Sequence, residues 1–394
     1  MILIVTSFFP YKYKENWIYP ELKGLSRHGK FCVLARTSSG KKTHSLPKNV
    51  QEIKVPIIGF SGLLECLINV NRLPSVAKLI YTHSNNVLDF LKRLSLLPKA
   101  LASVKKLRSM NINHVHVHTT SSPATLGLVI AKLLDVDFSF TVHTSAQLNE
   151  NFRPNYDGLM KHAKFVRTIS NLTKKELQEF ATNSCPIHTV RMGVDIDSIE
   201  NISSSKNYDK HNIIIISALE EYKGIDVAIF AIKELVNDYP NIKVDIYGEG
   251  SKRESLENLV SINQLNNVIN FKGVIPHKKI MSLLSEPGNY NYLLLASNKY
   301  SGQVEGIPVA IMEAMACYLI PITVDSGALR ELVDESCGVI ANEPCYKELT
   351  DKIRFLFETS QQEKHTMAAN AKSIIYKDYN SGINTLKLFE TLSS

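Results

Sequence analysis

The sequence predicts an α/β protein with two doubly wound domains, each built around a parallel β-sheet. The chain has 394 residues, of which 44% are hydrophobic and 21% charged, and this is enough for two domains that each bury a core. Short apolar runs alternate with amphipathic helical patterns along the whole chain, as they do in parallel sheets covered by helices. The polar segment 201–212 (NISSSKNYDKHN) precedes a run of isoleucines and indicates the boundary between the domains.

Short, mainly apolar runs predict the strands. In the first half they are Ile2 to Thr6, Phe31 to Ala35, His114 to His118, Phe138 to Val142 and Phe165 to Ile169. In the second half they are Ile213 to Ser217, Lys243 to Tyr247, Val268 to Phe271, Tyr292 to Ala296, Pro321 to Val324 and Gly338 to Ile340. Helical patterns lie between them, and the clearest, residues 225–236, places its apolar side chains on one face.

Charge and cysteine usage narrow the function classes. Lysine and arginine total 45 against 38 aspartates and glutamates, a net charge of +7. This excess suits an acidic substrate or an anionic membrane surface and is too dilute to indicate nucleic acid. The six cysteines form no CxxC and no zinc-site spacing, so we expect a reduced, cytosolic protein. Residues 1–10 read as a first strand, not a signal peptide, and no run reaches the ~20 apolar residues of a membrane span.

The most informative motif is Glu305 to Glu313 (EGIPVAIME), two glutamates eight residues apart. The loop 297–307 follows a predicted strand, and Pro308 stands at the start of the helix from Val309, where proline is favoured. Ligands of open α/β sheets bind outside the carboxyl ends of strands, so we expect Glu305 to face a crevice. Glu313 lies on an apolar helix, where its carboxylate needs donors such as ribose or sugar hydroxyls. A solvated Glu305 and a Glu313 paired with a lysine are the plain alternatives.

Three further features at predicted strand ends fit a phosphate group. The helix from Val309 offers unpaired backbone N–H groups and a positive dipole end, worth ~0.3 to 2 kcal/mol to an anion. Lys223 lies at the turn after the first strand of the second domain, where its charge can reach the same crevice. Gly248 and Gly250 follow the next strand and permit close approach of the backbone to a ligand. A solvated lysine and an ordinary turn are the alternatives.

Histidines mark a second region, in the first domain. His114, His116 and His118 alternate along one strand and share a face, but neighbours on a single strand do not converge on one ion, so we expect no metal site. His143 follows the strand 138–142 at its carboxyl end, where it can hydrogen-bond a reacting sugar or an acceptor. A structural histidine is the alternative. The chain lacks GxGxxG after the first strand, GxxxxGK[ST] and GxSxG, which argues against dinucleotide, P-loop and nucleophile-elbow enzymes.

One segment suggests a surface partner. Residues 88–110 interleave leucine and valine with basic side chains, and residues 63–79 are also apolar with few acids. The basic residues are Lys92, Arg93, Lys99, Lys105, Lys106 and Arg108. A basic amphipathic face of this kind can lie on anionic lipid, and an ordinary surface helix is the alternative.

Taken together, these motifs resemble in order and spacing the GT-B-fold retaining glycosyltransferases of family 4. In the second half the resemblance is carried by Lys223-Gly224, Gly248-Glu249-Gly250, Phe271 to Val274, Glu305 to Ala316 (EGIPVAIMEAMA) and Ser326 to Val333. In the first half it is carried by His114 to Thr125, Ser139 to Thr144 (SFTVHT), Thr168-Ile169-Ser170 and Gly193-Val194-Asp195, which are similar to stretches of bacterial exopolysaccharide and lipopolysaccharide members. It covers nearly the whole chain.

The resemblance implies two Rossmann-like domains that face a cleft. The first, 1–200, would bind the acceptor and be completed by a C-terminal helix over 374–394, with residues 374–392 crossing back onto it. The second, 208–373, would bind a nucleotide sugar. The nucleoside-diphosphate sugar would be a co-substrate, and the resemblance implies neither a further cofactor nor a metal ion, because lysine, arginine and a helix end stabilise the leaving diphosphate in this family.

The resemblance also assigns roles to residues. Lys223 would contact the donor diphosphate and Glu313 the ribose hydroxyls, while Glu305, with the backbone of Gly306 and Ile307, would hold the donor sugar. His143 would lie near the reacting centre or the acceptor. We expect the rest of the nucleotide-sugar site to comprise Gly248, Gly250, Pro308 and Val309.

At three positions the chain departs from the family pattern. Ala218 stands where an arginine usually precedes the lysine by five residues, Tyr318 replaces a common glycine, and Ala146 replaces an acidic residue. Loss of one transition-state donor can cost ~10²- to 10³-fold in rate. The cations that could substitute are Lys252, Arg253 and Lys299.

We therefore expect a cytosolic enzyme at the membrane surface that moves a sugar from a nucleoside diphosphate to an acceptor hydroxyl with retention. The acceptor would be a glycan or a lipid-linked precursor of bacterial surface polysaccharide. Two alternatives stay open: a nucleotide-sugar epimerase on the same fold, and a partner subunit that binds the donor without catalysing transfer.

Overall fold

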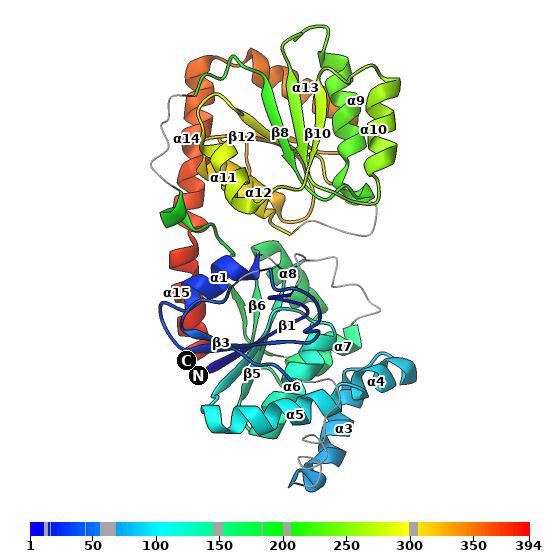
Figure 1. Ribbon diagram of the computed structural model, residues 1–394, viewed down its shortest axis with the longest axis vertical. Coiled ribbons are helices and arrows are strands. Elements are labelled where there is room, and N and C mark those ends of the chain that lie inside the picture. Colours follow the sequence, from blue (N-terminus) through cyan, green and yellow to red (C-terminus); the bar gives the residue numbers. More distant parts are fainter. Residues whose placement is uncertain are drawn as a thin grey trace. The chain divides into compact units, whose positions relative to one another are not determined.

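The computed structural model describes residues 1–11, 15, 17–43, 45–55, 68–144, 153–182, 184–199, 206–298 and 306–394 (Figure 1). The chain divides into two compact units. Unit 1 comprises Met1–Met192 with Ser381–Ser394, and unit 2 comprises Gly193–Asn380. Each unit is a parallel sheet with helices on its faces, so the predicted fold class is confirmed.

Unit 1 contains a seven-stranded sheet in the order β3-β2-β1-β4-β5-β6-β7. Its strands are β1 (Ile2–Thr6), β2 (Phe31–Ala35), β3 (Val50–Glu52), β4 (His114–Val117), β5 (Asp137–Val142), β6 (Phe165–Thr168) and β7 (Ile187–Thr189). All neighbours pair in parallel, and Ile2 of β1 lies opposite Phe31 on one side and His114 on the other. The strand order therefore reverses between β1 and β4, and loops leaving the carboxyl ends of these two strands diverge to opposite faces.

The helices of unit 1 include one from each end of the chain. They are α1 (Ile18–Leu25), α3 (Leu73–Thr82), α4 (Val87–Leu94), α5 (Leu97–Leu107), α6 (Ser122–Leu134), α7 (Arg153–Met160), α8 (Asn171–Phe180) and α15 (Ser381–Ser393). A glycine lets α6 approach the sheet closely, since a Cβ at Gly127 would lie 2.4 Å from Val117 Cγ2. In the same way Gly24 of α1 admits α15, because its Cβ would lie 2.5 Å from Thr385 Oγ1.

Unit 2 contains a six-stranded sheet in the order β10-β9-β8-β11-β12-β13. Its strands are β8 (Asn212–Ile216), β9 (Lys243–Tyr247), β10 (Ile269–Gly273), β11 (Tyr292–Leu295), β12 (Ile320–Val324) and β13 (Val339–Ala341). Its helices are α9 (Ile225–Leu235), α10 (Arg253–Ile262), α11 (His277–Ser285), α12 (Val309–Ala316), α13 (Tyr346–Glu358) and α14 (Gln361–Asp378). Here the strand order reverses between β8 and β11, which is where open α/β sheets bind their ligands.

The described structure differs from the predicted elements in a few places. The short edge strands β3 and β7 have only three residues each and no apolar run to reveal them. The helix expected over 374–392 is two helices, because α14 ends at Asp378 and α15 begins at Ser381. Between them Val194 pairs with Asn380 and donates its N–H to the carbonyl oxygen of Tyr379 at 2.8 Å. The chain accordingly passes from one unit to the other at Met192/Gly193 and at Asn380/Ser381. The sequence predicted these boundaries at 200/208 and 373/374.

Candidate functional site

The turn after β8 lies at the point where the strand order of unit 2 reverses. It forms a short 3-10 helix, Glu221–Lys223, and Gly224 then starts α9 with a φ of 60°. A Cβ at Gly224 would lie 2.0 Å from the carbonyl oxygen of Ala296, directly after β11. The N–H of Asn298 also donates to the carbonyl oxygen of Tyr222 at 2.9 Å. Lys223, half-buried and with Nζ 4.8 Å from the centre of the Tyr222 ring, is thereby held at the switch point.

The glycines after β9 bring a second turn against this one. Gly248 has a φ of 150°, and a Cβ there would lie 1.8 Å from the carbonyl oxygen of Ser217. A Cβ at Gly250 would lie 2.3 Å from that of Leu219, whose N–H donates to the carbonyl oxygen of Glu249 at 3.0 Å. Any larger residue at either glycine would push the turns apart. A cavity of about 280 Å³ opens beside them, lined in part by Ala218, Tyr247, Gly248, Gly273, Val274 and Ile280.

The start of α12 supplies backbone donors next to β11. Gly306 is half-buried, Ile307 is buried, and Pro308 caps the helix in an extended conformation with φ −68° and ψ 124°. The first bond within the helix runs from the N–H of Met312 to the carbonyl oxygen of Pro308 at 3.3 Å. No side chain of the described residues caps this turn, so its leading amides are free to donate to an anion. Glu305, predicted to hold the donor sugar, lies outside the described residues.

Glu313 is 9% exposed on α12, and it has one clear partner. The Nε2 of His277, the first residue of α11, lies 2.7 Å from Glu313 Oε1. This hydrogen bond raises the pKa of His277 above its usual value. Within the described residues no hydrogen bond reaches the other oxygen, Oε2, so Glu313 keeps an acceptor for a ligand hydroxyl.

The expected substitutes for the missing arginine at Ala218 are already engaged. Lys252 Nζ lies 3.2 Å from Glu221 Oε2. Arg253 forms ion pairs with Glu249 and Glu257, the second at 2.8 Å. Lys299 lies outside the described residues. Neither Lys252 nor Arg253 therefore offers an unshared charge in place of the arginine missing at position 218.

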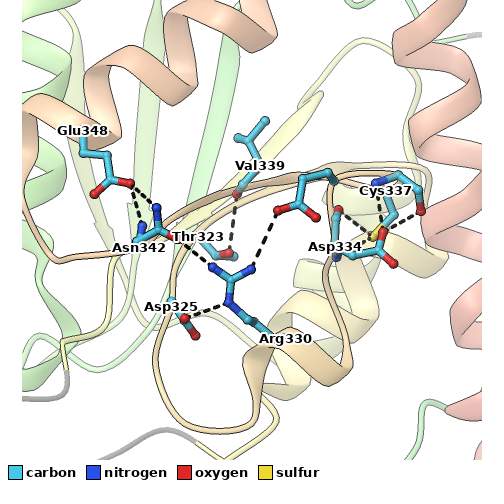
Figure 2. Close-up of polar contacts among 10 residues, drawn as sticks. Thr323, Asp325, Arg330, Asp334, Cys337, Val339, Asn342 and Glu348 are labelled. Carbon is cyan, nitrogen blue, oxygen red and sulfur yellow. Dashed lines mark hydrogen bonds and ion pairs between the residues drawn. The ribbon is translucent and has the colours of Figure 1, made fainter.

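Arg330 braces the far end of the same edge. Figure 2 shows its guanidinium between the loops that follow β12 and β13, where Nε donates to Asp325 Oδ2 and Nη2 to Asn342 Oδ1, both at 2.7 Å. Nη1 also lies 3.7 Å from Glu335 Oε1. The N–H of Asn342 in turn donates to Glu348 Oε1 at 2.8 Å. Arg330 thus stabilises the Ser326 to Val333 motif, and its charge is already shared with carboxylates of the protein.

In unit 1, His143 lies at the carboxyl edge of the sheet among buried charged groups. Its ring centre is 4.4 Å from that of Trp17 and 6.2 Å from that of His118. Below them Arg167 Nη2 donates to Glu21 Oε2 at 2.6 Å, and His118 Nε2 lies 3.3 Å from Glu21 Oε1. Burial raises the pKa of Glu21, yet the charges of Arg167, His118 and His143 and the hydrogen bond from Arg167 together outweigh it and lower the value to about 2.

The same surroundings keep His143 neutral. Burial, together with the positive charges of His118 and Arg167, lowers its pKa to about 3. Its Nε2 is buried and has no hydrogen-bond partner among the residues that the structure describes. A neutral imidazole with an open ring nitrogen can donate or accept a hydrogen bond but is a poor base near pH 7.

The other two strand histidines have structural roles. Ser139 Oγ bonds both His114 Nε2, at 2.6 Å, and His116 Nδ1, at 2.7 Å. Thr141 Oγ1 lies 2.9 Å from the remaining nitrogen of His116. Burial lowers the pKa of both rings, to about 4 for His114. Hydrogen bonds within the sheet therefore occupy these nitrogens.

The structure brings together, at one edge of unit 2, the predicted Lys223, Gly248, Gly250, Gly306 to Val309 and Glu313, while His143 belongs to unit 1. Sequence reasoning missed His277, although Pro276-His277 after β10 repeats the pattern of a helix beginning at a strand's carboxyl end. It also missed Trp17, Glu21 and Arg167, which are too far apart in sequence to form a motif.

Two family profiles match the chain, one on each half. The profile described as Glycosyltransferase Family 4 matches residues 33–198, and that of Glycosyl transferases group 1 matches residues 197–374. The putative colanic acid biosynthesis glycosyltransferase WcaL of Escherichia coli (strain K12) is 24% identical over 277 residues, 70% of this chain and 68% of that protein. The amylovoran biosynthesis glycosyltransferase AmsK of Erwinia amylovora is 26% identical over 306 residues, 75% of this chain and 73% of that protein.

Solved structures agree on the fold. Anabaena HepE, crystallised with UDP, has a TM-score of 0.71 at 16% identity, and the match covers 100% of this chain and 99% of that one. The sucrose-phosphate synthase of Thermosynechococcus elongatus has a TM-score of 0.77 at 13% identity, covering 99% and 98%. The two sheets thus form the GT-B fold, and the protein is a glycosyltransferase. The chain belongs to glycosyltransferase family 4.

The contact between His277 and Glu313 predicts a measurable titration. In Glu313→Gln the imidazole loses its anionic partner, so we expect the pKa of His277, raised in the wild type, to fall towards its ordinary value, as followed by NMR of the ring. Glu348→Gln is the matched control, since Glu348 accepts hydrogen bonds from Asn342 and not from a histidine. An unchanged His277 titration in Glu313→Gln would contradict the contact.

Proposed function

We propose that this protein transfers a sugar from a nucleoside-diphosphate sugar to an acceptor hydroxyl, with retention of the anomeric configuration. One observation carries the donor half of this proposal: at the switch point of unit 2, a lysine turn, a glycine turn and the uncapped start of α12 adjoin the carboxyl ends of β8, β9 and β11. A cation, a backbone that a ligand can approach closely and the positive end of a helix dipole together suit a diphosphate. The crystals of HepE contain UDP, which supports this class of donor.

Each predicted residue has a role in donor binding under this proposal. Lys223 and the amides at Val309 hold the diphosphate, and Glu313 accepts hydrogen bonds from the ribose through Oε2 while His277 fixes its position. Gly248 and Gly250 let the two turns pack together, and the 280 Å³ cavity beside them receives the nucleoside. Glu305 and the backbone of Gly306 and Ile307 hold the donor sugar, as the family resemblance implies.

The chemistry is substitution at the anomeric carbon of the donor. The bond from this carbon to the diphosphate oxygen breaks, the acceptor oxygen bonds to the carbon from the same face, and its proton passes to the leaving diphosphate. Lys223 and the α12 amides stabilise the charge that develops on the diphosphate, so we propose that the reaction needs no metal ion or further cofactor. His143 contributes as a neutral hydrogen-bonding group to the sugar or the acceptor, because its pKa of about 3 disfavours proton abstraction.

We propose a polysaccharide precursor, free or lipid-linked, as the acceptor. The names of WcaL and AmsK place those relatives in colanic acid and amylovoran biosynthesis, and both are polysaccharides. The reaction would then take place at the inner face of the membrane, where such precursors are held by lipid.

The proposed membrane contact rests on α3 and α4 of unit 1. Val87 and Leu88 are 66% and 70% exposed, Leu91 is 53% exposed, and Tyr81 on α3 adds a further apolar side chain. Lys92 follows on α4 and is also exposed. Apolar residues beside a cation suit the surface of an anionic bilayer. No helix in the described part of the chain is long and apolar enough to cross a bilayer.

The structure corrects the basic face predicted for residues 88–110. Arg93 is only 7% exposed and Lys99 only 3%. Lys99 Nζ donates to the carbonyl oxygens of Ala35 and Arg36, at 2.9 and 2.6 Å, and so holds the end of β2. These two cations therefore serve the interior of unit 1 and not its surface.

Substitution at the donor site should abolish turnover. With a nucleotide-sugar panel and an extracted bacterial lipid fraction as acceptor, Lys223→Ala and Glu305→Ala should each reduce release of nucleoside diphosphate by ~10²-fold or more. Lys233→Ala, on the exposed face of α9, is the matched control and should retain full rate. NMR of the product should show the anomeric configuration of the donor.

Other outcomes would identify the alternatives. An epimerase would return a changed nucleotide sugar without any acceptor. A partner subunit would bind the nucleotide sugar but show no turnover in the wild type. Full transfer by both variants would mean that the site assignment is wrong.

The membrane contact predicts binding to anionic vesicles. The full chain should sediment with phosphatidylglycerol vesicles more than with phosphatidylcholine vesicles, and less at high salt. Leu88→Glu combined with Leu91→Glu should weaken this binding at least about tenfold, because two apolar anchors are lost. Ile262→Glu, at an exposed apolar position on α10 of unit 2, should have no effect. Equal binding by all variants would exclude α4 as the contact.

A further inference from the structure

A second cavity, of about 630 Å³, lies wholly within unit 1. Its walls come from α4, the first turns of α6 and α7, and the loops that follow β2 and β4. Its size is in the range of small-molecule sites. None of the described residues of the predicted donor site contributes to it, so its ligand has to be sought from its own chemistry.

Three cations and one carboxylate line this cavity: Arg36, Lys92, Arg93 and Asp89. Arg93 is fixed, since Nε donates to Asp89 Oδ2 and Nη1 to Thr125 Oγ1, both at 2.8 Å. Asp89 thus balances Arg93, while neither Arg36 nor Lys92 forms an ion pair with a described residue. Arg36 is half-buried, with its Nε buried and unpartnered in the described structure. The cavity therefore carries a net positive charge.

Neutral donors surround the same space. Thr119, Thr120, Ser121 and Ser122 all line it and lead into α6. Within the described residues, no side chain caps the start of this thirteen-residue helix. Hydroxyls, an uncapped helix start and cations are the groups that bind phosphate oxygens.

Asn155 adds a requirement that a bare anion does not meet. It is 3% exposed, lines the cavity and donates from Nδ2 to the carbonyl oxygen of Thr120 at 2.8 Å. Its Oδ1 is buried and has no partner among the described residues. A buried acceptor left unpaired is costly, and a ligand with a donor, such as a hydroxyl, relieves this cost. The ligand therefore needs phosphate oxygens and hydroxyl groups together.

We propose that this cavity binds a sugar or polyol phosphate, and that it is the part of the acceptor next to the hydroxyl that is glycosylated. This inference rests on the proposed function, because it names the class of the acceptor. Arg36, Lys92 and the α6 turn bind the phosphate, and Asn155 accepts from a ring hydroxyl. Leu88, one turn before Lys92 on α4, and Leu91, directly before it, are exposed, so they could contact a lipid carried by the phosphate.

The test is direct binding to the full-length protein. Glucose 1-phosphate and inorganic phosphate are titrated by ³¹P NMR with the wild type, Arg36→Ala/Lys92→Ala, Asn155→Leu and the control Lys132→Ala. Lys132 is exposed in the last turn of α6, at the other end of the helix from the cavity. We expect glucose 1-phosphate to bind at least tenfold more tightly than phosphate. The double variant should bind both ligands at least tenfold more weakly than the wild type does. Asn155→Leu should weaken the binding of glucose 1-phosphate alone, and Lys132→Ala should weaken the binding of neither ligand.

Two results would overturn the inference. The first is equal affinity for both ligands in every variant. The second is binding that is lost in Lys223→Ala but kept in Arg36→Ala/Lys92→Ala, because the ligand would then bind to unit 2. UDP binding, measured by thermal shift on the same variants, separates this failure from failure of the proposed function. Retained UDP binding in Arg36→Ala/Lys92→Ala shows that the variant is folded and the donor site intact, whereas absence of UDP binding in the wild type would count against the donor proposal alone.

Vesicles then identify the source of the ligand. Displacement of glucose 1-phosphate by phosphatidylinositol vesicles, and not by phosphatidylserine vesicles of the same net charge, assigns the cavity to a lipid-borne polyol phosphate. Retained binding in the presence of both assigns it to a soluble sugar phosphate.

Discussion

The proposed donor site depends on how closely two crossover connections approach each other at the switch point of unit 2. The turn after β8 passes so near the end of β11 that only hydrogen fits at Gly224, and the turn after β9 presses on the β8 turn in the same way at Gly248. These contacts position Lys223, because Gly224, the residue next to it, is packed tightly against the end of β11. A side chain at either glycine would therefore disturb the site without touching a ligand.

Several cations in both units stabilise the structure, and others lie where they can bind a ligand. Arg330, Arg253, Arg167 and Lys99 direct their charge to carboxylates or carbonyls of the protein itself. Arg36 and Lys92 in unit 1 are placed differently, since they line a cavity and form no ion pair with a described residue. Since a cation already satisfied by carboxylates contributes little to an incoming phosphate, this division separates candidate ligand-binding residues from braces.

The fold and the elements around the proposed donor site followed from the sequence because local signals determine them. Apolar runs located the long strands, and Pro308 marked a helix start that the structure reproduces. The partner of Glu313, the burial of Lys99 and the cavity in unit 1 could not be predicted, because each depends on packing between distant segments. Tyr318 illustrates the limit: it stands where the family commonly has glycine, and it adopts a φ of 60°, a backbone conformation that the sequence does not announce.

The most direct test of the account is thermal unfolding of the full chain with nucleoside diphosphates and nucleotide sugars, in the presence of a chelator. A ligand that binds only the native state stabilises it and so raises the melting temperature. At a concentration a hundred times the dissociation constant, the stabilisation is about 2.7 kcal/mol. We predict a shift of several degrees for one nucleotide sugar and its diphosphate, lost in Lys223→Ala and kept in Lys233→Ala. No shift with any of them at millimolar concentration would contradict a donor site in unit 2.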